Sequence, residues 1–379
     1  MKGVAVLGST GSIGMATLDV LRRQHQRFRV VALTAGRNRQ LLDLQAAEFT
    51  PAFVGVVDGR TEGRKDGRTE RGEHCGPECL IEAATRPDVD IVVNAVVGFA
   101  GLDATLAALR AGKRVALANK ESLVVGGELV LAVAREGGGE LIPVDSEHSA
   151  ILQCITGQRS RPVRLVLTAS GGPFREWSPD QMADATVADA LRHPTWRMGN
   201  KITVDSATLA NKALEVIEAH HLFAMGYDRI EVVVHPQSVV HGLVEFEDGS
   251  MLAQLGLPSM ELPILYALTH PERLHDVGVP RLDPVAVGSL TFEPLRDDVF
   301  PAFACGIAAG RRGGTAPAVF NAANEAAVAA FLAGRIPFRR IAGLVSEICA
   351  GHEPAAVSSL DTVRNADLWA RARAEELIA

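Results

Sequence analysis

The chain has 379 residues, of which 47% are hydrophobic and 22% charged, so it is long enough to bury the cores of two or three domains. Its formal charge of -7 argues against a surface built for nucleic acid or anionic lipid. A small anionic ligand could still bind in a local basic pocket, and we expect ligands of that kind. The five cysteines are odd in number and scattered, which excludes a disulfide framework.

The first residues run straight into a glycine-rich loop, with no recognisable export or organelle sequence. The longest apolar stretch, Ile91 to Leu102, is interrupted by Asn94 and two glycines, and it is shorter than the roughly 20 residues that cross a bilayer. Cys75 and Cys79 have a spacing near that of zinc ligands but lack a second pair. We therefore expect a cytoplasmic protein that binds neither membrane nor nucleic acid.

Short apolar runs alternate with amphipathic stretches through the first part of the chain, at residues 4–7, 30–33, 53–57, 91–93 and 115–117. This alternation predicts an α/β fold with a parallel, Rossmann-like sheet in a domain over residues 1–145. Because such sheets bind ligands at the carboxyl ends of their strands, each loop that follows a run is a candidate site.

The first of these loops contains Gly8, Gly11 and Gly14 in a G-x-x-G-x-x-G spacing, directly after the first strand. Glycines allow the backbone to approach a pyrophosphate closely, and helix N–H groups face its charge. The spacing is not G-x-G-x-x-G, and a tight strand-to-helix turn is the alternative. Its position after a first strand favours a dinucleotide site.

The second apolar run is followed by Arg37 and Arg39, where an NAD-selective protein usually carries an acid. Arginine suits a 2′-phosphate, so NADP is favoured, although both residues could instead be solvated at a helix start. After the run at 115–117, Asn119, Lys120 and Glu121 offer an amide, a cation and a carboxylate near the nicotinamide, or else a polar helix N-terminus.

Asp145 and Glu147 stand one residue apart after another apolar strand. If that segment is extended, both side chains point the same way and can converge on one cation. Further on, Asp205 and Ser206 are good helix caps, and we expect a helix to begin there with Asn211, Lys212 and Glu215 on one polar face. Such a face is by default solvated surface.

A helix start with Ser206, Asn211 and Lys212 can instead bind a phosphate, while Glu215 reaches a metal. Three carboxylates without cysteine select Mg²⁺ or Mn²⁺.

Composition predicts two long loops. Residues 58–76 are rich in glycine and mixed charge, which predicts a surface loop, and the long polar segment 171–199 is interpreted as a lid. Strand-like runs at 164–169, 230–234, 239–246 and 251–255, with a hairpin signal at Asp248-Gly249, predict an antiparallel part in an α+β catalytic domain over 146–270. A linker at 271–300 then leads to a helical domain over 301–379, with helices near 302–310, 316–333, 338–350 and 361–378.

The chain resembles the 1-deoxy-D-xylulose 5-phosphate reductoisomerase family in motifs that appear in the family order across nearly its whole length. The main departure is the segment from Asp58 to Gly76. The motifs are Gly8-Ser-Thr-Gly-Ser-Ile-Gly14, Asn119-Lys-Glu-Ser-Leu123, Pro143-Val-Asp-Ser-Glu-His-Ser149, Ala169-Ser-Gly-Gly172, His193-Pro-Thr-Trp-Arg-Met-Gly-Asn-Lys201, Val204-Asp-Ser-Ala-Thr208, Asn211-Lys212, Glu215 and His235-Pro-Gln-Ser238.

The resemblance implies roles for individual residues. It makes Asp145, Glu147 and Glu215 the metal ligands, and Ser170, Ser206, Asn211 and Lys212 the residues that hold the substrate phosphate. It adds Ser146, Lys120, His193 and His241 on the substrate side, Trp196 in the lid, and Met198 and Met260 as apolar neighbours. For the cofactor we predict contacts from Thr10, Gly11, Ser12, Ile13, Gly36, Arg37, Asn38, Asn119, Glu121 and Gly199.

The activity implied is an NADPH-dependent and metal-dependent rearrangement and reduction of a ketose phosphate, in a homodimer. Two alternatives stay open from the sequence alone. A metal-assisted oxidative decarboxylase also pairs NADP with acidic ligands, although it has no need of a phosphate-binding set. An NADPH-sensing module that has lost its chemistry is the other.

Overall fold

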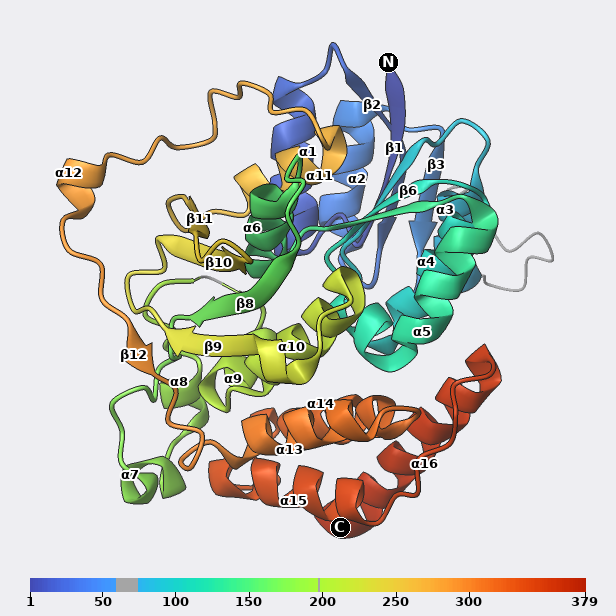
Figure 1. Cartoon of the computed structure of the whole chain (residues 1–379). Helices are drawn as coiled ribbons and strands as arrows, with labels where there is room; N and C mark the ends of the chain where they lie inside the picture. Colours follow the sequence, from blue (N-terminus) through green and yellow to red (C-terminus); the bar gives the residue numbers. More distant parts are fainter. Residues whose placement is uncertain (59–73, 197) are drawn as a thin grey trace. The chain divides into compact units, whose positions relative to one another are not determined.

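The computed structural model of the chain describes residues 1–58, 74–196 and 198–379 (Figure 1). They form two compact units. Unit 1 comprises residues 1–122, 130–149 and 259–280, and unit 2 comprises 123–129, 150–258 and 281–379. The loop predicted over 58–76 falls mostly outside the described residues, and the prediction is wrong for His74–Cys75, which form the strand β4. The predicted boundaries of three domains stay predictions.

Unit 1 contains a seven-stranded, all-parallel sheet in the order β4-β3-β2-β1-β5-β6-β7. Every apolar run predicted in this region forms a strand, which confirms the Rossmann-like sheet. The order of strands reverses between β1 and β5, and the crevice at such a switch point is where open α/β sheets bind ligands. The strands are β1 Lys2–Leu7, β2 Phe28–Ala35, β3 Phe53–Val56, β4 His74–Cys75, β5 Ile91–Asn94, β6 Arg114–Leu117 and β7 Glu140–Pro143.

The sheet of unit 1 is buried because its central strands are continuous apolar runs rather than alternating ones. Residues 4–7 of β1 are wholly inaccessible to solvent, as expected for a parallel strand covered on both faces. The helices of this unit are α1 Ser12–Arg23, α2 Arg39–Phe49, α3 Glu78–Thr85, α4 Leu102–Arg110, most of α5 Lys120–Gly137, the start of α6 Ser146–Ile155, and α11 Glu261–Thr269, with the 3-10 turn η1 Phe99–Gly101 before α4.

Segment 259–280 joins this unit through ion pairs at the end of α1. The Arg23 guanidinium lies 2.7 Å from Glu261 and 2.6 Å from the buried carboxylate of Asp276. The chain therefore returns to unit 1 late in its sequence.

Unit 2 contains a five-stranded mixed sheet in the order β11-β10-β8-β9-β12. The predicted antiparallel part is present, because β10 pairs antiparallel with both β8 and β11, while β8 and β9 are parallel. Leu165 and Leu167 of β8 pack in one core with Val216 and Ala219 of the helix α10 Ala210–Phe223. The strands are β8 Pro162–Ala169, β9 Ile230–Val234, β10 Val240–Phe246, β11 Met251–Leu255 and β12 Glu293–Pro294.

The four helices expected after residue 300 are confirmed, and they pack together in unit 2 (Figure 1). They are α13 Pro301–Arg312, α14 Ala316–Leu332, α15 Phe338–Ala350 and α16 Leu360–Ile378. Helix α14 contacts the other three and is buried along most of its length. None of the helices in the described residues is long and apolar enough to span a membrane.

The described residues of the polar segment 171–199 include two short helices, α7 Pro179–Ala183 and α8 Val187–Ala190. Each begins with a capping box, formed by Ser178 with Gln181 and by Thr186 with Asp189. At the start of the segment the buried Phe174 ring packs edge-on against Phe338, with 4.9 Å between ring centroids. The remaining helices of unit 2 are α9 Asn200–Ala207, α10 Ala210–Phe223 and α12 Pro284–Val287, with the 3-10 turn η2 Tyr227–Arg229.

Candidate active site

The glycine loop leads from β1 directly into α1, as the sequence predicts. Residues 10–13 are exposed or half-buried, so their backbone is open to a ligand. Gly14 shows why a side chain is excluded in the first turn: a Cβ there would lie 2.3 Å from the Gly8 carbonyl oxygen and 2.6 Å from the Ser9 Cα. The helix start is therefore held tightly against the loop, with its N–H groups available to an anion.

The loop after β2 carries the predicted cofactor residues Gly36, Arg37 and Asn38, all exposed. The Asn38 side chain caps α2 by accepting from the N–H of Leu41, at 3.2 Å. The side chain of Arg37 is 90% exposed, and its guanidinium lies 2.6 Å from the Asp58 carboxylate. Because an exposed pair of this kind is weak, Arg37 can exchange Asp58 for a phosphate.

Asn119 and Glu121 fix the start of α5 to the loop after β5. The buried Asn119 amide donates to the carbonyls of Val96 and Gly98, at 2.8 and 2.9 Å, and to the Glu121 carboxylate at 2.9 Å. Its oxygen accepts from the N–H of Ser122, which makes Asn119 the N-cap of α5. The helix-start alternative is thus present in the structure, and the predicted contacts of these two side chains with the nicotinamide stay predictions.

Lys120 and Asp145 form an ion pair at the carboxyl edge of the sheet in unit 1, with 2.8 Å between Nζ and Oδ2. The expectation that Asp145 and Glu147 alternate along an extended segment is wrong. The Asp145 carbonyl accepts from the N–H of Ser149 at 2.8 Å, and Ser146 and Glu147 lie in the first turn of α6.

The two carboxylates still converge, because a carboxylate oxygen of Asp145 lies within 4.8 Å of one of Glu147. The Ser146 hydroxyl donates to the Glu147 carboxylate and so orients it. Both groups are oxygen ligands of the kind that hard divalent cations prefer, so the pair fits Mg²⁺ or Mn²⁺.

In unit 2, the expected helix start at Asp205 and Ser206 is also wrong. These residues lie in the last turn of α9, and the next helix, α10, begins at Ala210 after Leu209 in a left-handed conformation with φ of 58°. Because Leu209 carries no turn signal, the break between the two helices cannot be seen in the sequence. Asn211 and Lys212 are therefore the residues that occupy a helix N-terminus.

The polar face of α10 is buried, so the solvated-surface alternative fails for Lys212 and Glu215, which are 4% and 1% exposed. Asn211 and Lys212 both donate to the Glu215 carboxylate, and the Lys212 ammonium also donates to the Thr168 carbonyl at 2.6 Å. A buried charged cluster of this kind costs desolvation energy, which makes it a candidate for function rather than for stability.

Ser170 follows β8 and is held by His193. Trp196 and Thr195 donate their N–H groups to His193 Nδ1, at 2.9 and 3.2 Å, so the ring proton is on Nε2. That nitrogen lies 3.0 Å from the Ser170 hydroxyl and donates to it. Burial lowers the pKa of His193 to about 4, so the ring is neutral near pH 7.

The turn after Ser170 is tightly packed against α9. Gly172 adopts a φ of +67°, and a Cβ there would lie 2.6 Å from the Ser206 carbonyl oxygen. Its N–H donates to the Ser170 hydroxyl at 3.2 Å. Reasoning from the residues alone missed Ser170 and His193. The small pair Gly171-Gly172 after a strand was the signal available, since it marks a close approach of backbone.

His241 and Trp196 were also implied only by the family resemblance. His241 is buried and its Nε2 lies 3.1 Å from the Gly256 carbonyl oxygen. The half-buried Trp196 ring lies 6.2 Å from the His241 ring, between centroids. These two side chains are thus neighbours in unit 2.

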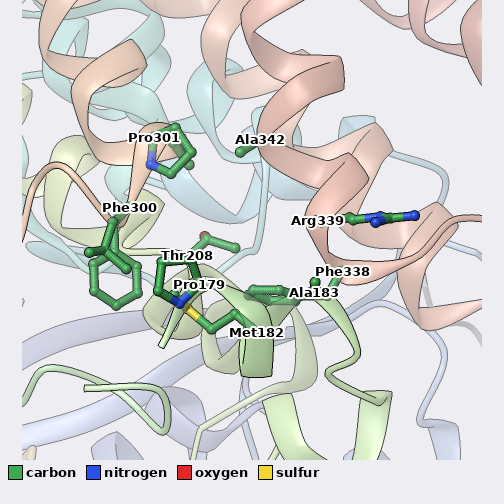
Figure 2. A pocket seen from close by; sticks show the side chains of 11 residues that line it. Pro179, Met182, Ala183, Thr208, Phe300, Pro301, Phe338, Arg339 and Ala342 are labelled. Carbon is green, nitrogen blue, oxygen red and sulfur yellow. The ribbon is translucent and has the colours of Figure 1, made fainter. Parts of the chain in front are cut away.

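A small apolar cavity of about 140 Å³ lies elsewhere in unit 2, between α7 and the first turns of α13 and α15 (Figure 2). Met182, Phe300 and Pro301 line it, and the Arg339 guanidinium points away from it in Figure 2. Apart from Thr208, which follows Ser206 by two residues, the cavity shares no lining residue with the motifs described above.

A parallel sheet with a glycine loop and a cation after β2, followed by converging carboxylates, defines the class of NADP-dependent oxidoreductases that use a divalent metal. Models of three 1-deoxy-D-xylulose 5-phosphate reductoisomerase segments match residues 4–127, 141–223 and 255–373, the last two being C-terminal domains. The chain belongs to the 1-deoxy-D-xylulose 5-phosphate reductoisomerase family.

Similar proteins match over their full length. The chain is 50% identical to the reductoisomerase of Desulfitobacterium hafniense, with 100% of both chains covered, and 51% identical to that of a Synechococcus strain, covering 100% of this chain and 97% of the other. A crystal structure of a reductoisomerase with NADPH, fosmidomycin and magnesium has a TM-score of 0.93 at 42% identity, covering 100% of this chain and 98% of that one. The Zymomonas mobilis enzyme with NADPH has a TM-score of 0.89 at 43% identity, covering 100% and 99%.

Proposed function

We propose that this chain converts 1-deoxy-D-xylulose 5-phosphate to 2-C-methyl-D-erythritol 4-phosphate, with NADPH and a divalent cation, in the non-mevalonate isoprenoid pathway. The observation that carries the proposal is the cluster of half-buried Asn211 with buried Lys212 and Glu215, in a chain 50% identical to reductoisomerases over its whole length. A phosphate-binding helix start next to a carboxylate is what a metal-dependent enzyme for a sugar phosphate needs.

Asp145, Glu147 and Glu215 are the proposed metal ligands. All three offer carboxylate oxygens, and no cysteine stands among them, so the donor set fits Mg²⁺ or Mn²⁺ rather than zinc. When bound, the cation would polarise the substrate carbonyl and stabilise developing negative charge, while NADPH supplies a hydride. A relative of this chain was crystallised with magnesium.

Ser170, Ser206, Asn211 and Lys212 are the proposed phosphate-binding residues. The hydroxyl of Ser170 already accepts from His193 Nε2 and from the N–H of Gly172, so its own proton is left to donate to a phosphate oxygen. Lys212 supplies a cation at the start of α10, where the helix dipole adds to the attraction for an anion. His193 thus acts through Ser170 as a neutral donor.

Lys120 and Ser146 are proposed to contact the substrate beside the metal ligands. The Lys120 ammonium is largely buried, so a hydrogen bond from it to a substrate oxygen would be stronger than in water. Its pairing with Asp145 holds it in place before the substrate arrives. His241 is a further proposed substrate contact, and Trp196 is proposed to lie over the substrate in the lid over residues 171–199 that excludes water.

We propose that the cofactor is bound by the loops after β1 and β2, at the carboxyl edge of the sheet, together with Asn119, Glu121 and Gly199. The first loop contributes Thr10, Gly11, Ser12 and Ile13, and the second contributes Gly36, Arg37 and Asn38. Support comes from their exposure after β1 and β2 and from the cation that suits a 2′-phosphate.

Loss of NADPH absorbance in the presence of 1-deoxy-D-xylulose 5-phosphate and Mg²⁺ tests the proposal. Turnover that requires both the sugar phosphate and the metal is expected, and EDTA should abolish it. Reduction of NADP⁺ with release of carbon dioxide from a hydroxy acid would indicate an oxidative decarboxylase instead. Binding of NADPH without turnover would indicate a sensing module.

A homodimer in the cytoplasm is proposed as the state of the protein. All five cysteines of the described chain are free thiols, as expected in a reducing compartment, and the family resemblance suggests the dimer. Light scattering after size exclusion tests the dimer, and a mass near that of one 40.2 kDa chain would contradict it.

A further inference from the structure

Asn324 of α14 contacts a carboxylate that no proposed role explains. Its amide nitrogen lies 2.7 Å from Oδ1 of Asp205, which is in the last turn of α9. Asn324 is 0% exposed and Asp205 is 1% exposed. The two residues are 119 positions apart in the sequence, so the contact is a product of the fold of unit 2.

The Asp205 carboxylate is held from two sides. Lys201, one helical turn earlier on α9, places its ammonium 3.0 Å from Oδ2, while Asn324 donates to Oδ1. A buried carboxylate costs several kcal/mol to desolvate unless it is paired or hydrogen-bonded, so losing the hydrogen bond from Asn324 or the ion pair with Lys201 disturbs the position of Asp205.

Asp205 is tied to the phosphate-binding residues by the backbone. Ser206 is the next residue, and the Asp205 carbonyl accepts from the Thr208 hydroxyl at 3.2 Å. The Thr208 hydroxyl in turn accepts from the N–H of Ala210, the first residue of α10, at 3.3 Å. A shift of Asp205 therefore moves both Ser206 and the start of the helix that carries Asn211 and Lys212.

We infer that Asn324 is a positioning residue for the phosphate-binding set: through Asp205 it holds the junction of α9 and α10 in the geometry that receives a phosphate. This rests on the proposed function, because it assigns the purpose of the junction. It also gives the C-terminal helices a role in substrate binding, in which Asn324 acts through the Asp205 carboxylate.

Asn324→Leu is the direct test, because it keeps the side-chain size and removes the donor. Asn321→Leu is its matched control: Asn321 lies three residues earlier on the same helix, is also 0% exposed, and bonds Glu325 at 3.1 Å instead of Asp205. We expect Asn324→Leu to raise KM for the sugar phosphate about tenfold, because a hydrogen bond to a charged group is lost. The kcat and the Kd for NADPH should change by less than about threefold. Asn321→Leu should leave all three within about threefold of the parent.

A KM for Asn324→Leu within about twofold of the parent would overturn the inference, as would an equal rise in Asn321→Leu. If Asn324→Leu does not fold, exchanging the amide and the carboxylate between positions 324 and 205 provides a second test. Asn324→Asp places a carboxylate against Asp205 and should raise KM, and adding Asp205→Asn restores an amide facing a carboxylate and should recover at least about threefold of that rise. A double variant no better than Asn324→Asp would overturn the inference.

Calorimetric titration with inorganic phosphate separates this inference from the proposed function. If the parent does not turn over the sugar phosphate, the proposed function fails, yet the Kd for phosphate still reports on the junction. We expect Asn324→Leu to bind inorganic phosphate more weakly than the parent, and Asn321→Leu to bind it with unchanged affinity. Equal phosphate affinity in the two variants would overturn the inference whatever the reaction is.

Discussion

The Lys120 ammonium and the Asp145 carboxylate lie 2.8 Å apart in unit 1. Lys120 is the first residue of α5, and Asp145 directly precedes the first residue of α6. A cation at a helix N-terminus is disfavoured by the dipole, and Asp145 offsets that cost. The pair therefore keeps a lysine where it would not otherwise be stable, beside the carboxylate proposed to bind the metal.

Replacement of this cation should separate catalysis from metal binding. In Lys120→Met we expect turnover to fall by about 100-fold, the usual cost of removing a preorganised donor to developing charge. The affinity for Mn²⁺ should not weaken, because a positive charge next to Asp145 is removed. Steady-state kinetics with a Mn²⁺ titration measure both quantities, and full turnover in the variant would refute the role of Lys120.

Reversal of charge at Arg37 should affect the cofactor alone. Arg37→Asp is expected to raise KM for NADPH by about tenfold or more while leaving weak use of NADH unchanged or improved, because the 2′-phosphate loses its cation. Arg29→Asp is the control, since Arg29 is exposed on β2, the strand that precedes the loop with Arg37, and donates to the Asp88 carbonyl at 3.3 Å. Equal KM values for NADPH in the two variants would count against the assignment.

Insertion of a methyl group at Gly14 should block the cofactor loop. A Cβ there would lie 2.3 Å from the Gly8 carbonyl oxygen, so Gly14→Ala must push α1 away from the loop and weaken NADPH binding by about tenfold or more. Gly343→Ala in α15 has no atom closer than 3.6 Å to the new Cβ and should stabilise the protein by about 0.5–1 kcal/mol. Fluorescence titration with NADPH and urea unfolding compare them.

The neutral state of His193 has a pH consequence. Its folded pKa is about 4, below the unfolded value near 6.5, so its contribution to stability is fully present above pH 6.5 and is lost as the pH falls towards 4. In NMR spectra with labelled histidine, the resonance that disappears in His193→Gln should not titrate between pH 5 and 8. A midpoint near 6.5 would show that Ser170 does not face a neutral donor.

Local periodicity was sufficient to predict the longer strands of unit 1 and the four C-terminal helices, because their apolar patterns are set by burial within each element. It missed β4, whose two residues His74 and Cys75 are too few to show a period. It placed Asp145 and Glu147 at a sheet edge correctly but gave them an extended backbone, although Ser146 and Glu147 already begin α6. A carboxylate just before a helix is also an N-cap signal, and that competing principle prevailed.

What could not be predicted depends on residues far apart in the chain or on backbone states without a sequence signal. The attachment of segment 259–280 to α1 depends on Arg23 and Asp276, which are 253 positions apart. The separation of α9 from α10 depends on Leu209, a residue type that rarely adopts positive φ. The Asn324 to Asp205 bond combines both difficulties, since α14 reads as an ordinary buried helix.

A titration of Mn²⁺ against the parent and Glu215→Gln, followed by electron paramagnetic resonance of the free ion, tests most directly whether Asp145, Glu147 and Glu215 bind one divalent cation. Removing one charged ligand should weaken Mn²⁺ binding by about tenfold or more and reduce turnover, with the Kd for NADPH changed by less than about twofold. Equal Mn²⁺ affinity and full activity in Glu215→Gln would contradict the account.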